Sequence, residues 1–206
     1  MKERIIVFGG TGDVGRLIVD KLINNKETVY VLTRQEKLSV DNLHYIVGNV
    51  LDKKIIEQTI QQGDKIVIAL GFNNSDFDTM SKGTANIIEA MKKKGAKRLI
   101  CLSAQGAGDS WEYMPEDFKQ MVLNDEILNA SFKDHSIQEK FVTQTDLNWT
   151  IVRPTEIIAD KENGTFTVNK PTEKSKFQIS NLDVAQFIVT ELTEEKYLKQ
   201  VVMITD

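Results

Sequence analysis

The glycine-rich segment at residues 9–15 constrains the fold of this chain more than any other feature. It reads Gly-Gly-Thr-Gly-Asp-Val-Gly, so Gly10, Gly12 and Gly15 have the spacing G-x-G-x-x-G. It follows the apolar run at residues 5–8, typical of a strand covered on both faces, and precedes apolar residues recurring at helical spacing. A glycine turn between a buried strand and a helix lets the backbone approach a pyrophosphate and points helix amides at it. The segment therefore predicts a dinucleotide-binding loop, with an ordinary glycine turn as the alternative. The expected cofactor contacts in it are Gly9, Thr11, Gly12, Asp13 and Val14.

The rest of the chain alternates β-branched runs with amphipathic stretches. Strands are expected at 28–33, 43–47, 65–70, 98–103 and 149–152, with short candidates at 164–168 and 177–179 and a closing edge strand at 201–205. Helices are expected at 55–61, at about 80–94 ending before Gly95, at 116–144, and at 181–192 after the N-cap Ser180; residues 105–115 read as a loop. This alternation predicts right-handed βαβ units. The expected fold is α/β: a doubly wound, mostly parallel Rossmann-type sheet with helices on both faces and a small C-terminal extension on the substrate side.

Length and composition exclude several classes. The 206 residues favour one domain spanning 1–206, and the net charge of −4 supplies no basic field for nucleic acid or an anionic membrane. One cysteine, Cys101, and two histidines are too few for a disulfide or a His/Cys metal site. The sequence has no apolar run of membrane-spanning length, and its N-terminus does not read as a signal peptide. We expect a cytoplasmic protein without a metal.

The end of the second expected strand predicts which dinucleotide is bound. An acidic residue there accepts from the 2′-hydroxyl of NAD, but this chain has Thr33-Arg34 and no acid before Glu36. A guanidinium suits a phosphate, so Arg34 favours NADP(H); a solvated surface arginine is the alternative. The Asp13 carboxylate would repel a pyrophosphate beside it, so this side chain must turn outward or cap the helix.

Several further motifs, together with the glycine loop and the Thr33-Arg34 strand end, resemble one family over nearly the whole chain. They are the segments 48–52 (GNVLD), 70–71 (LG), 82–88 (KGTANII), 102–104 (LSA), 152–154 (VRP) and 179–185 (ISNLDVA). Together they resemble the short-chain dehydrogenase/reductase superfamily, in its atypical NmrA-like branch. The chain length, the Asp134-His135 pair and the step from Lys140 to Pro154 are most similar to the biliverdin-IXβ reductase/flavin reductase group.

The resemblance implies roles for single residues. In order along the cofactor, it places Asn49 and Val50 at the adenine, Leu70 and Gly71 at the adenosine ribose, Lys140 at the nicotinamide ribose, Ser103 beside the nicotinamide, and Pro154, Thr155 and Ile157 at the carboxamide. Ser103 and Lys140 are the implied catalytic residues. In the alternative interpretation, Val50 and Leu70 belong simply to the core and Lys140 is a surface lysine.

One departure from the family decides the expected chemistry. Its YxxxK motif requires Tyr at 136, where this chain has Ser136, and Glu156 stands where the closer relatives carry His. A serine hydroxyl is too weak an acid to replace a phenol. The flavin reductases that this chain resembles also lack that tyrosine. The resemblance therefore implies an oxidoreductase, an NADPH-dependent reductase that transfers hydride to a flavin, a quinone or a similar conjugated, tetrapyrrole-like acceptor, with water as proton source. The alternatives are an NmrA-like NADP(H)-sensing regulator without turnover and a relative of sugar-nucleotide epimerases and dehydratases.

The substrate side follows the fifth expected strand. Trp111, Tyr113, Met114 and Phe118 either form an aromatic lid over a flat ring or pack the loop onto the helix beneath it. His135 is either a proton shuttle or a helix-surface histidine, and Cys101 reads as an inert core thiol. We expect a small-molecule acceptor, no nucleic-acid or membrane partner, and a monomer or weak homodimer.

Overall fold

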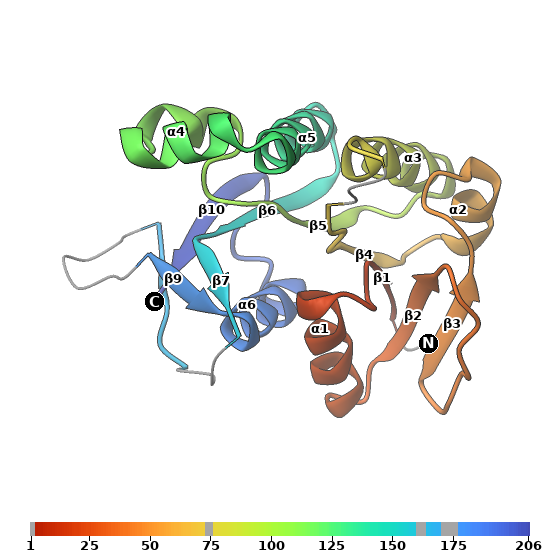
Figure 1. The fold of residues 1–206 in the computed structure, drawn as a ribbon. Coiled ribbons are helices and arrows are strands. Elements are labelled where there is room, and N and C mark those ends of the chain that lie inside the picture. Colours follow the sequence, from red (N-terminus) through yellow and green to blue (C-terminus); the bar gives the residue numbers. More distant parts are fainter. Residues whose placement is uncertain (1–2, 73–75, 160–163, 170–176) are drawn as a thin grey trace.

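A computed structural model describes residues 3–72, 76–159, 164–169 and 177–206 and contains the expected parallel sheet (Figure 1). Its strands, in spatial order, are β3 (Leu43–Val47), β2 (Thr28–Thr33), β1 (Arg4–Phe8), β4 (Lys65–Ile68), β5 (Arg98–Leu102), β6 (Asn148–Pro154), β10 (Gln200–Thr205) and β8 (Thr167–Val168). All neighbours are parallel except β10 and β8. A separate parallel pair joins β7 (Glu156–Ile158) to β9 (Gln178–Ser180). The expected doubly wound, mostly parallel sheet is confirmed.

Helices cover both faces of the sheet, as expected. α1 (Asp13–Asn24) and α6 (Asn181–Glu194) lie on one face, and α2 (Lys53–Thr59), α3 (Thr79–Lys94), α4 (Glu116–Asn124) and α5 (Glu126–Thr143) lie on the other (Figure 1). Successive residues of β1 alternate between the two layers. Ile5 and Val7 join the core under α1 and α6, whereas Ile6 and Phe8 join the core under α2 and α3. This two-sided burial explains the continuous apolar runs in the sequence.

Two expectations about elements were wrong. The stretch 116–144 is mostly helical, as expected, but it forms two helices, because Asp125 lies outside helical geometry and its side chain caps α5 by accepting from the Leu128 amide. The loop at 105–115 contains a 3₁₀ helix, η1 (Gly108–Tyr113). The closing strand β10 is not at the edge of the sheet, since β8 pairs beyond it through two residues. By contrast, Gly95 ends α3 in the left-handed conformation and Ser180 caps α6, both as predicted.

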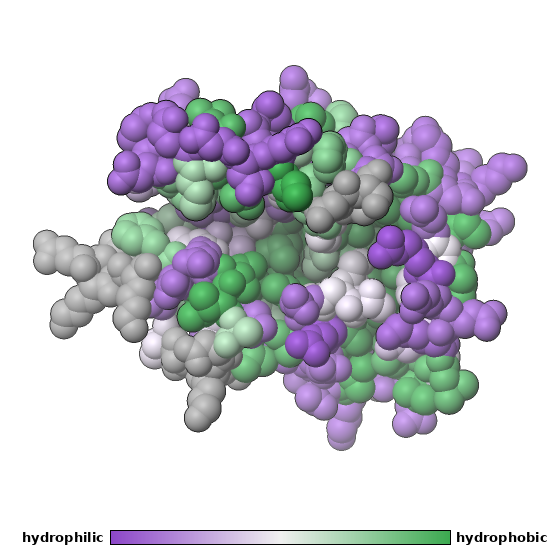
Figure 2. All heavy atoms as spheres, in the orientation of Figure 1, coloured by the Kyte–Doolittle hydropathy of each residue, from purple (hydrophilic) through white to green (hydrophobic). Residues whose placement is uncertain are grey.

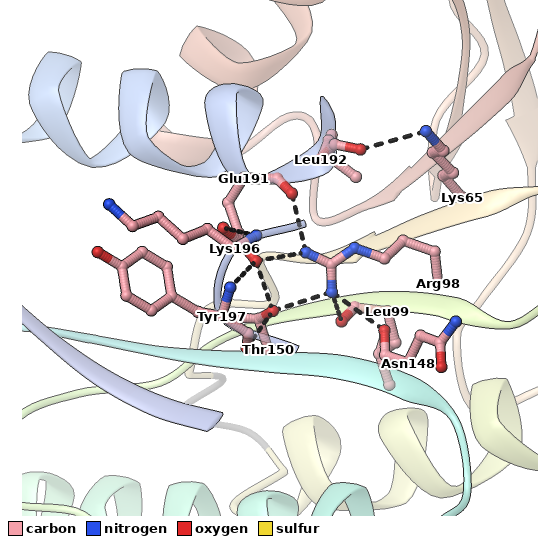
Figure 3. A network of polar contacts seen from close by, with 9 residues as sticks. All are labelled: Lys65, Arg98, Leu99, Asn148, Thr150, Glu191, Leu192, Lys196 and Tyr197. Carbon is pink, nitrogen blue, oxygen red and sulfur yellow. Dashed lines mark hydrogen bonds and ion pairs between the residues drawn. The ribbon is translucent and has the colours of Figure 1, made fainter. Parts of the chain in front are cut away.

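A buried ion pair joins the starts of β5 and β6 to the end of α6 (Figure 3). The Arg98 guanidinium donates to Glu191 Oε1 at 2.9 Å and to Thr150 Oγ1 at 2.9 Å. Glu191 also accepts from the backbone amides of Lys196 and Tyr197. The network lies at the starts of these strands, so it stabilises the fold at the edge opposite to the ligand-binding edge of a sheet of this kind. Within the described parts of the chain, no helix is long and apolar enough to cross a bilayer.

Candidate functional site

A cleft of about 570 Å³ lies at the carboxyl ends of β1, β2, β3 and β4. Figure 2 shows this face hollowed across the middle, with apolar residues deep in the hollow and hydrophilic residues around it. The lining includes eight of the predicted cofactor contacts: Gly9, Thr11, Gly12, Arg34, Asn49, Val50, Leu70 and Gly71. Residues from four separate segments of the sequence therefore meet in one cleft of ligand size.

The glycine loop has the geometry that a pyrophosphate requires. Gly9 has φ +87°, and a Cβ on it would lie 2.1 Å from the Ala69 carbonyl oxygen. A Cβ on Gly15 would lie 2.0 Å from the Gly9 oxygen, so α1 packs directly on the turn. A Cβ on Gly12 would meet only that same oxygen, at 3.4 Å. A side chain at Gly12 would thus occupy open cleft at the start of α1, the space that a phosphate group needs.

The other two predicted residues of the loop do not line the cleft. Asp13 is exposed in the first turn of α1, which agrees with the outward orientation. Val14 is half-buried against the core on the α1 side of the sheet. Their proposed cofactor contacts remain predictions.

At the predicted adenosine end of the cleft, Val50 and Leu70 line the cleft and also pack in the core. Gly83 of α3 lies so close that a Cβ on it would be 2.8 Å from Val50 and 3.2 Å from Leu70. Asn86 also donates to the Val50 carbonyl at 3.1 Å. α3 therefore holds this wall of the cleft in place. The two alternatives for these residues, cofactor contact and core, do not exclude each other.

Two polar side chains complete the adenosine end. Asn49 Oδ1 accepts from the Leu51 amide at 3.0 Å, which fixes the turn after β3. Arg34 is exposed, lines the cleft and forms no ion pair with any described residue. Lys37, nearby in sequence, lies over the Tyr45 ring at 5.8 Å and does not line the cleft. The contact of Arg34 with the 2′-phosphate of NADP(H) remains a prediction.

The remaining predicted site residues lie outside the lining of this cleft. Lys140 is exposed on α5, and Pro154 is buried at the end of β6. Thr155 is buried and donates to Thr205 Oγ1 at 3.1 Å, and Ile157 is exposed on β7. Their cofactor contacts stay predictions. Glu156, which stands in the place of a histidine, is exposed and accepts from Gln178 at 2.8 Å.

Ser103 takes part in a buried charge network that sequence reasoning missed. Its Oγ donates to Glu139 Oε1 at 2.6 Å. Arg153 holds the same carboxylate through Nε at 2.8 Å and Nη2 at 2.6 Å, and pairs with Asp109 at 2.7 Å. Burial lowers the pKa of Arg153, but the hydrogen bonds and charges of Glu139 and Asp109 outweigh it and raise that pKa overall. Helical periodicity places Glu139 on α5, and nothing in the sequence pairs it with Ser103 or Arg153.

Ser136, the residue in the place of the family tyrosine, is engaged with backbone groups. Its Oγ accepts from the Gly108 amide at 2.9 Å and donates to the Phe132 carbonyl at 2.7 Å. It therefore anchors the start of η1 to α5. One residue earlier, His135 Nδ1 lies 3.2 Å from Gln138 Oε1. Burial lowers the pKa of His135, although Gln138 and the nearby charges of Glu139 and Asp134 act to raise it.

Two residues of the predicted aromatic lid, Trp111 and Phe118, pack against α5. The Trp111 and Phe118 rings lie 6.4 Å and 5.5 Å from the Phe132 ring, which agrees with the packing alternative. Trp111 also lines a second cavity, of about 510 Å³, between η1, α4 and α5. Tyr113 is 82% exposed. Substrate contacts by Trp111, Tyr113 and Phe118 remain predictions.

Neither the cysteine nor a metal cluster supplies chemistry among the described residues. Cys101 is fully buried in β5, and burial together with the Glu139 charge raises the pKa of its thiol far above neutrality. It is an inert core thiol. Among the residues that the structure describes, no cluster of His, Cys, Asp and Glu is arranged to hold a metal ion.

Comparison with known proteins identifies the class. The model of the NAD(P)H-binding family matches residues 9–195, so this chain belongs to that family. The match agrees with the cleft, the glycine loop and the strand order described above, and confirms the resemblance to the NmrA-like, atypical short-chain dehydrogenases/reductases. The protein therefore has an NAD(P)H-binding Rossmann fold.

Particular relatives are similar at low identity. The photosystem II assembly factor Ycf39 of Synechocystis is 27% identical over 158 residues, covering 73% of this chain and 44% of that protein. The chain thus spans less than half the length of this curated relative. ChuY from Escherichia coli O157:H7, described as an anaerobillin reductase, has a TM-score of 0.81 at 17% identity, covering 98% of this chain and 96% of its own. A short-chain dehydrogenase/reductase from Veillonella parvula, in complex with NADP, also has a TM-score of 0.81, at 16% identity, covering 100% and 95%. These two structures share the fold.

Proposed function

We propose that this protein is an NADPH-dependent reductase that transfers hydride to a flavin, a quinone or a similar conjugated, tetrapyrrole-like acceptor. The observation that carries the proposal is the position of Ser136. Its hydroxyl is held between the Gly108 amide and the Phe132 carbonyl, where the usual carbonyl-reducing chemistry needs a free phenol. An electron-poor conjugated ring accepts hydride without a strong acid beside it.

When bound, NADPH supplies the hydride and becomes NADP⁺, while water supplies the proton that completes reduction of the acceptor. The chain's own residues bind and orient. Amides at the start of α1, beside Gly12, hold the pyrophosphate, and Arg34 holds the 2′-phosphate. The wall formed by Val50 and Leu70 excludes water from the adenosine. Catalysis by such residues is chiefly orientation and solvent exclusion.

Two solved relatives support the choice of cofactor and acceptor class. The Veillonella parvula structure holds NADP, and ChuY is described as an anaerobillin reductase. Both share the fold of this chain, at 17% and 16% identity, and their descriptions agree with the proposed cofactor and the proposed class of acceptor. We expect Trp111, Tyr113 and Phe118 to flank the acceptor's ring, and Lys140 and Ser103 to contact the nicotinamide half of the cofactor.

The test is to mix the purified protein with NADPH and, separately, FMN, riboflavin, biliverdin and menadione, and to follow the loss of NADPH absorbance. Turnover of at least one of these acceptors is expected, with NADH a poorer donor. The Ser136→Ala variant should leave kcat nearly unchanged. A loss of about 10³-fold in kcat would indicate proton transfer by that hydroxyl and refute the mechanism.

A second candidate, an NADP(H)-sensing regulator without turnover, has one observation in its favour. Large apolar side chains are exposed on α4 and α5: Met121, Leu123, Ile127, Ile137 and Phe141. Such a surface is typical of partner binding. Tight NADPH binding with no turnover of any acceptor would favour this candidate over the reductase.

A third candidate function is that of an epimerase or a dehydratase, because some relatives of this chain are described as such enzymes. A putative UDP-glucose 4-epimerase of Methanocaldococcus jannaschii is 31% identical over 129 residues. Serine in place of tyrosine at 136 argues against that activity. A single domain over residues 1–206, a cytoplasmic location and a monomer or weak homodimer remain parts of the proposal.

A further inference from the structure

The buried carboxylate of Glu139 determines which kind of hydrogen bond Ser103 can make to a ligand. Glu139 is 4% exposed, and both of its carboxylate oxygens accept from the Arg153 guanidinium, Oε1 from Nε and Oε2 from Nη2, a group that can only donate. At 2.6 Å, the hydroxyl hydrogen of Ser103 must therefore point at Glu139 Oε1. The donor capacity of Ser103 is used up within the protein.

The acceptor capacity of Ser103 is unused. Among the described residues, none donates to Ser103 Oγ, whereas its backbone amide is taken by the Val152 carbonyl at 2.8 Å. The Glu139–Arg153 ion pair is also held in place by η1, which packs against it. A Cβ on Gly108 would lie 2.5 Å from Glu139 Oε2 and 2.6 Å from Arg153 Nη2, so the start of η1 closes directly over the ion pair. The Asp109–Arg153 contact and the Ser136–Gly108 hydrogen bond hold η1 in that position.

Ser103 directly follows β5. This strand pairs with β4, and the residues that follow β4 line the predicted cofactor cleft. In a doubly wound sheet the first three strands hold the adenosine half of a dinucleotide, and the following strands hold the nicotinamide half. Ser103 thus lies where the nicotinamide and the acceptor meet under the proposed function, on which this placement rests.

We propose that Glu139 is a positioning residue that fixes Ser103 as a hydrogen-bond acceptor, so that the ligand atom facing Ser103 is an N–H donor rather than a carbonyl oxygen. The same chemistry has two sources: the carboxamide –NH₂ of the nicotinamide and an N–H of the acceptor's ring. A ketone or quinone oxygen at this place would meet lone pairs, and making a bond to it would require breaking the charge-assisted bond to Glu139.

The experiment has one arm for each source. In the cofactor arm, the dissociation constants of NADPH and of reduced 3-acetylpyridine adenine dinucleotide phosphate are compared. The analogue keeps the carbonyl and lacks the N–H. In the acceptor arm, lumiflavin is compared with 3-methyllumiflavin by kcat/KM or, without turnover, by binding to the NADP⁺ complex. In one arm the wild type should favour the N–H ligand by about tenfold, the effect of one hydrogen bond.

Two variants separate positioning from stability. Ser103→Ala should abolish the preference. Glu139→Gln should also abolish it, because Arg153 takes the single amide oxygen and the amide –NH₂ then donates to Ser103, which frees the hydroxyl hydrogen to turn to the ligand. The matched control is Glu191→Gln, which makes the same change in the equally buried, arginine-paired carboxylate of Figure 3, at the opposite edge of the sheet. It should lower Tm and leave the preference at its wild-type value.

The outcomes are distinct. The proposal is overturned if neither arm shows a preference in the wild type, if Ser103→Ala retains it, or if Glu191→Gln reduces it as much as Glu139→Gln does. Should Glu139→Gln fail to fold, Ser103→Ala still tests whether the Ser103 hydroxyl carries the preference, and a preference retained in that variant overturns the proposal. A lack of turnover with every acceptor would refute the proposed reductase, yet both binding measurements would still test the role of Ser103.

Discussion

Removal of the Arg34 side chain tests the assignment of the cofactor most directly. Arg34 lines the adenosine end of the cleft and forms no ion pair with a described residue, so its guanidinium is free to hold a 2′-phosphate. A hydrogen bond to a charged group contributes about 1.5–3 kcal/mol, but exposed ion pairs are weakened by solvent to about 1 kcal/mol or less. Because Arg34 is exposed and the 2′-phosphate is close to doubly charged, we expect an intermediate value of about 1–2 kcal/mol, hence a roughly 5- to 30-fold preference for NADPH.

The assay is a titration of protein fluorescence with NADPH and with NADH, for the wild type, Arg34→Ala and Lys37→Ala. Arg34→Ala should lose the preference by weakening NADPH binding alone. Lys37→Ala is the matched control, because Lys37 lies over Tyr45 and outside the cleft lining. High salt should reduce the wild-type preference, since the screening length falls from about 10 Å at 0.1 M to about 3 Å at 1 M. Equal weakening of both cofactors by Arg34→Ala would refute the assignment.

Three further predictions concern the loop, the fold and pH. Gly15→Ala should weaken NADPH binding by about 10- to 100-fold, the effect of one misplaced amide–phosphate bond, because its Cβ would overlap the Gly9 oxygen; an unchanged dissociation constant would contradict this. Glu191→Leu should destabilise the protein by about 3–5 kcal/mol in denaturant unfolding, since it leaves a buried guanidinium unpaired; a loss below about 1 kcal/mol would argue against the network. Because burial lowers the pKa of His135, the unfolded chain binds its proton first and stability should fall as pH drops below about 6.5. His135→Gln should flatten that slope in unfolding measurements, whereas a slope reduced equally by His44→Gln would contradict the assignment.

Local patterns in the sequence were sufficient to predict most of the fold. The apolar run of β1, the glycine turn and the amphipathic α1 are neighbours along the chain, so their joint geometry follows from backbone sterics and side-chain period. The same holds for the left-handed Gly95 and the Ser180 cap. The break at Asp125 was missed because the apolar pattern continues across it, and a capping aspartate in a polar stretch is indistinguishable from a surface one.

The candidate site also has one part that the sequence predicted and one part that only the structure revealed. The sequence by itself determined which segments meet in the cleft predicted to hold the adenosine and pyrophosphate, because each of them directly follows a strand, and parallel strands bring their carboxyl ends to one edge. Only the tertiary structure decided what Ser103 and Ser136 do. The partner of Ser103 is 36 residues away on α5, and Ser136 binds an amide 28 residues away in η1. Such contacts depend on how helices pack on the sheet and on which buried polar groups must be satisfied, and these are properties of the whole fold rather than of any local pattern.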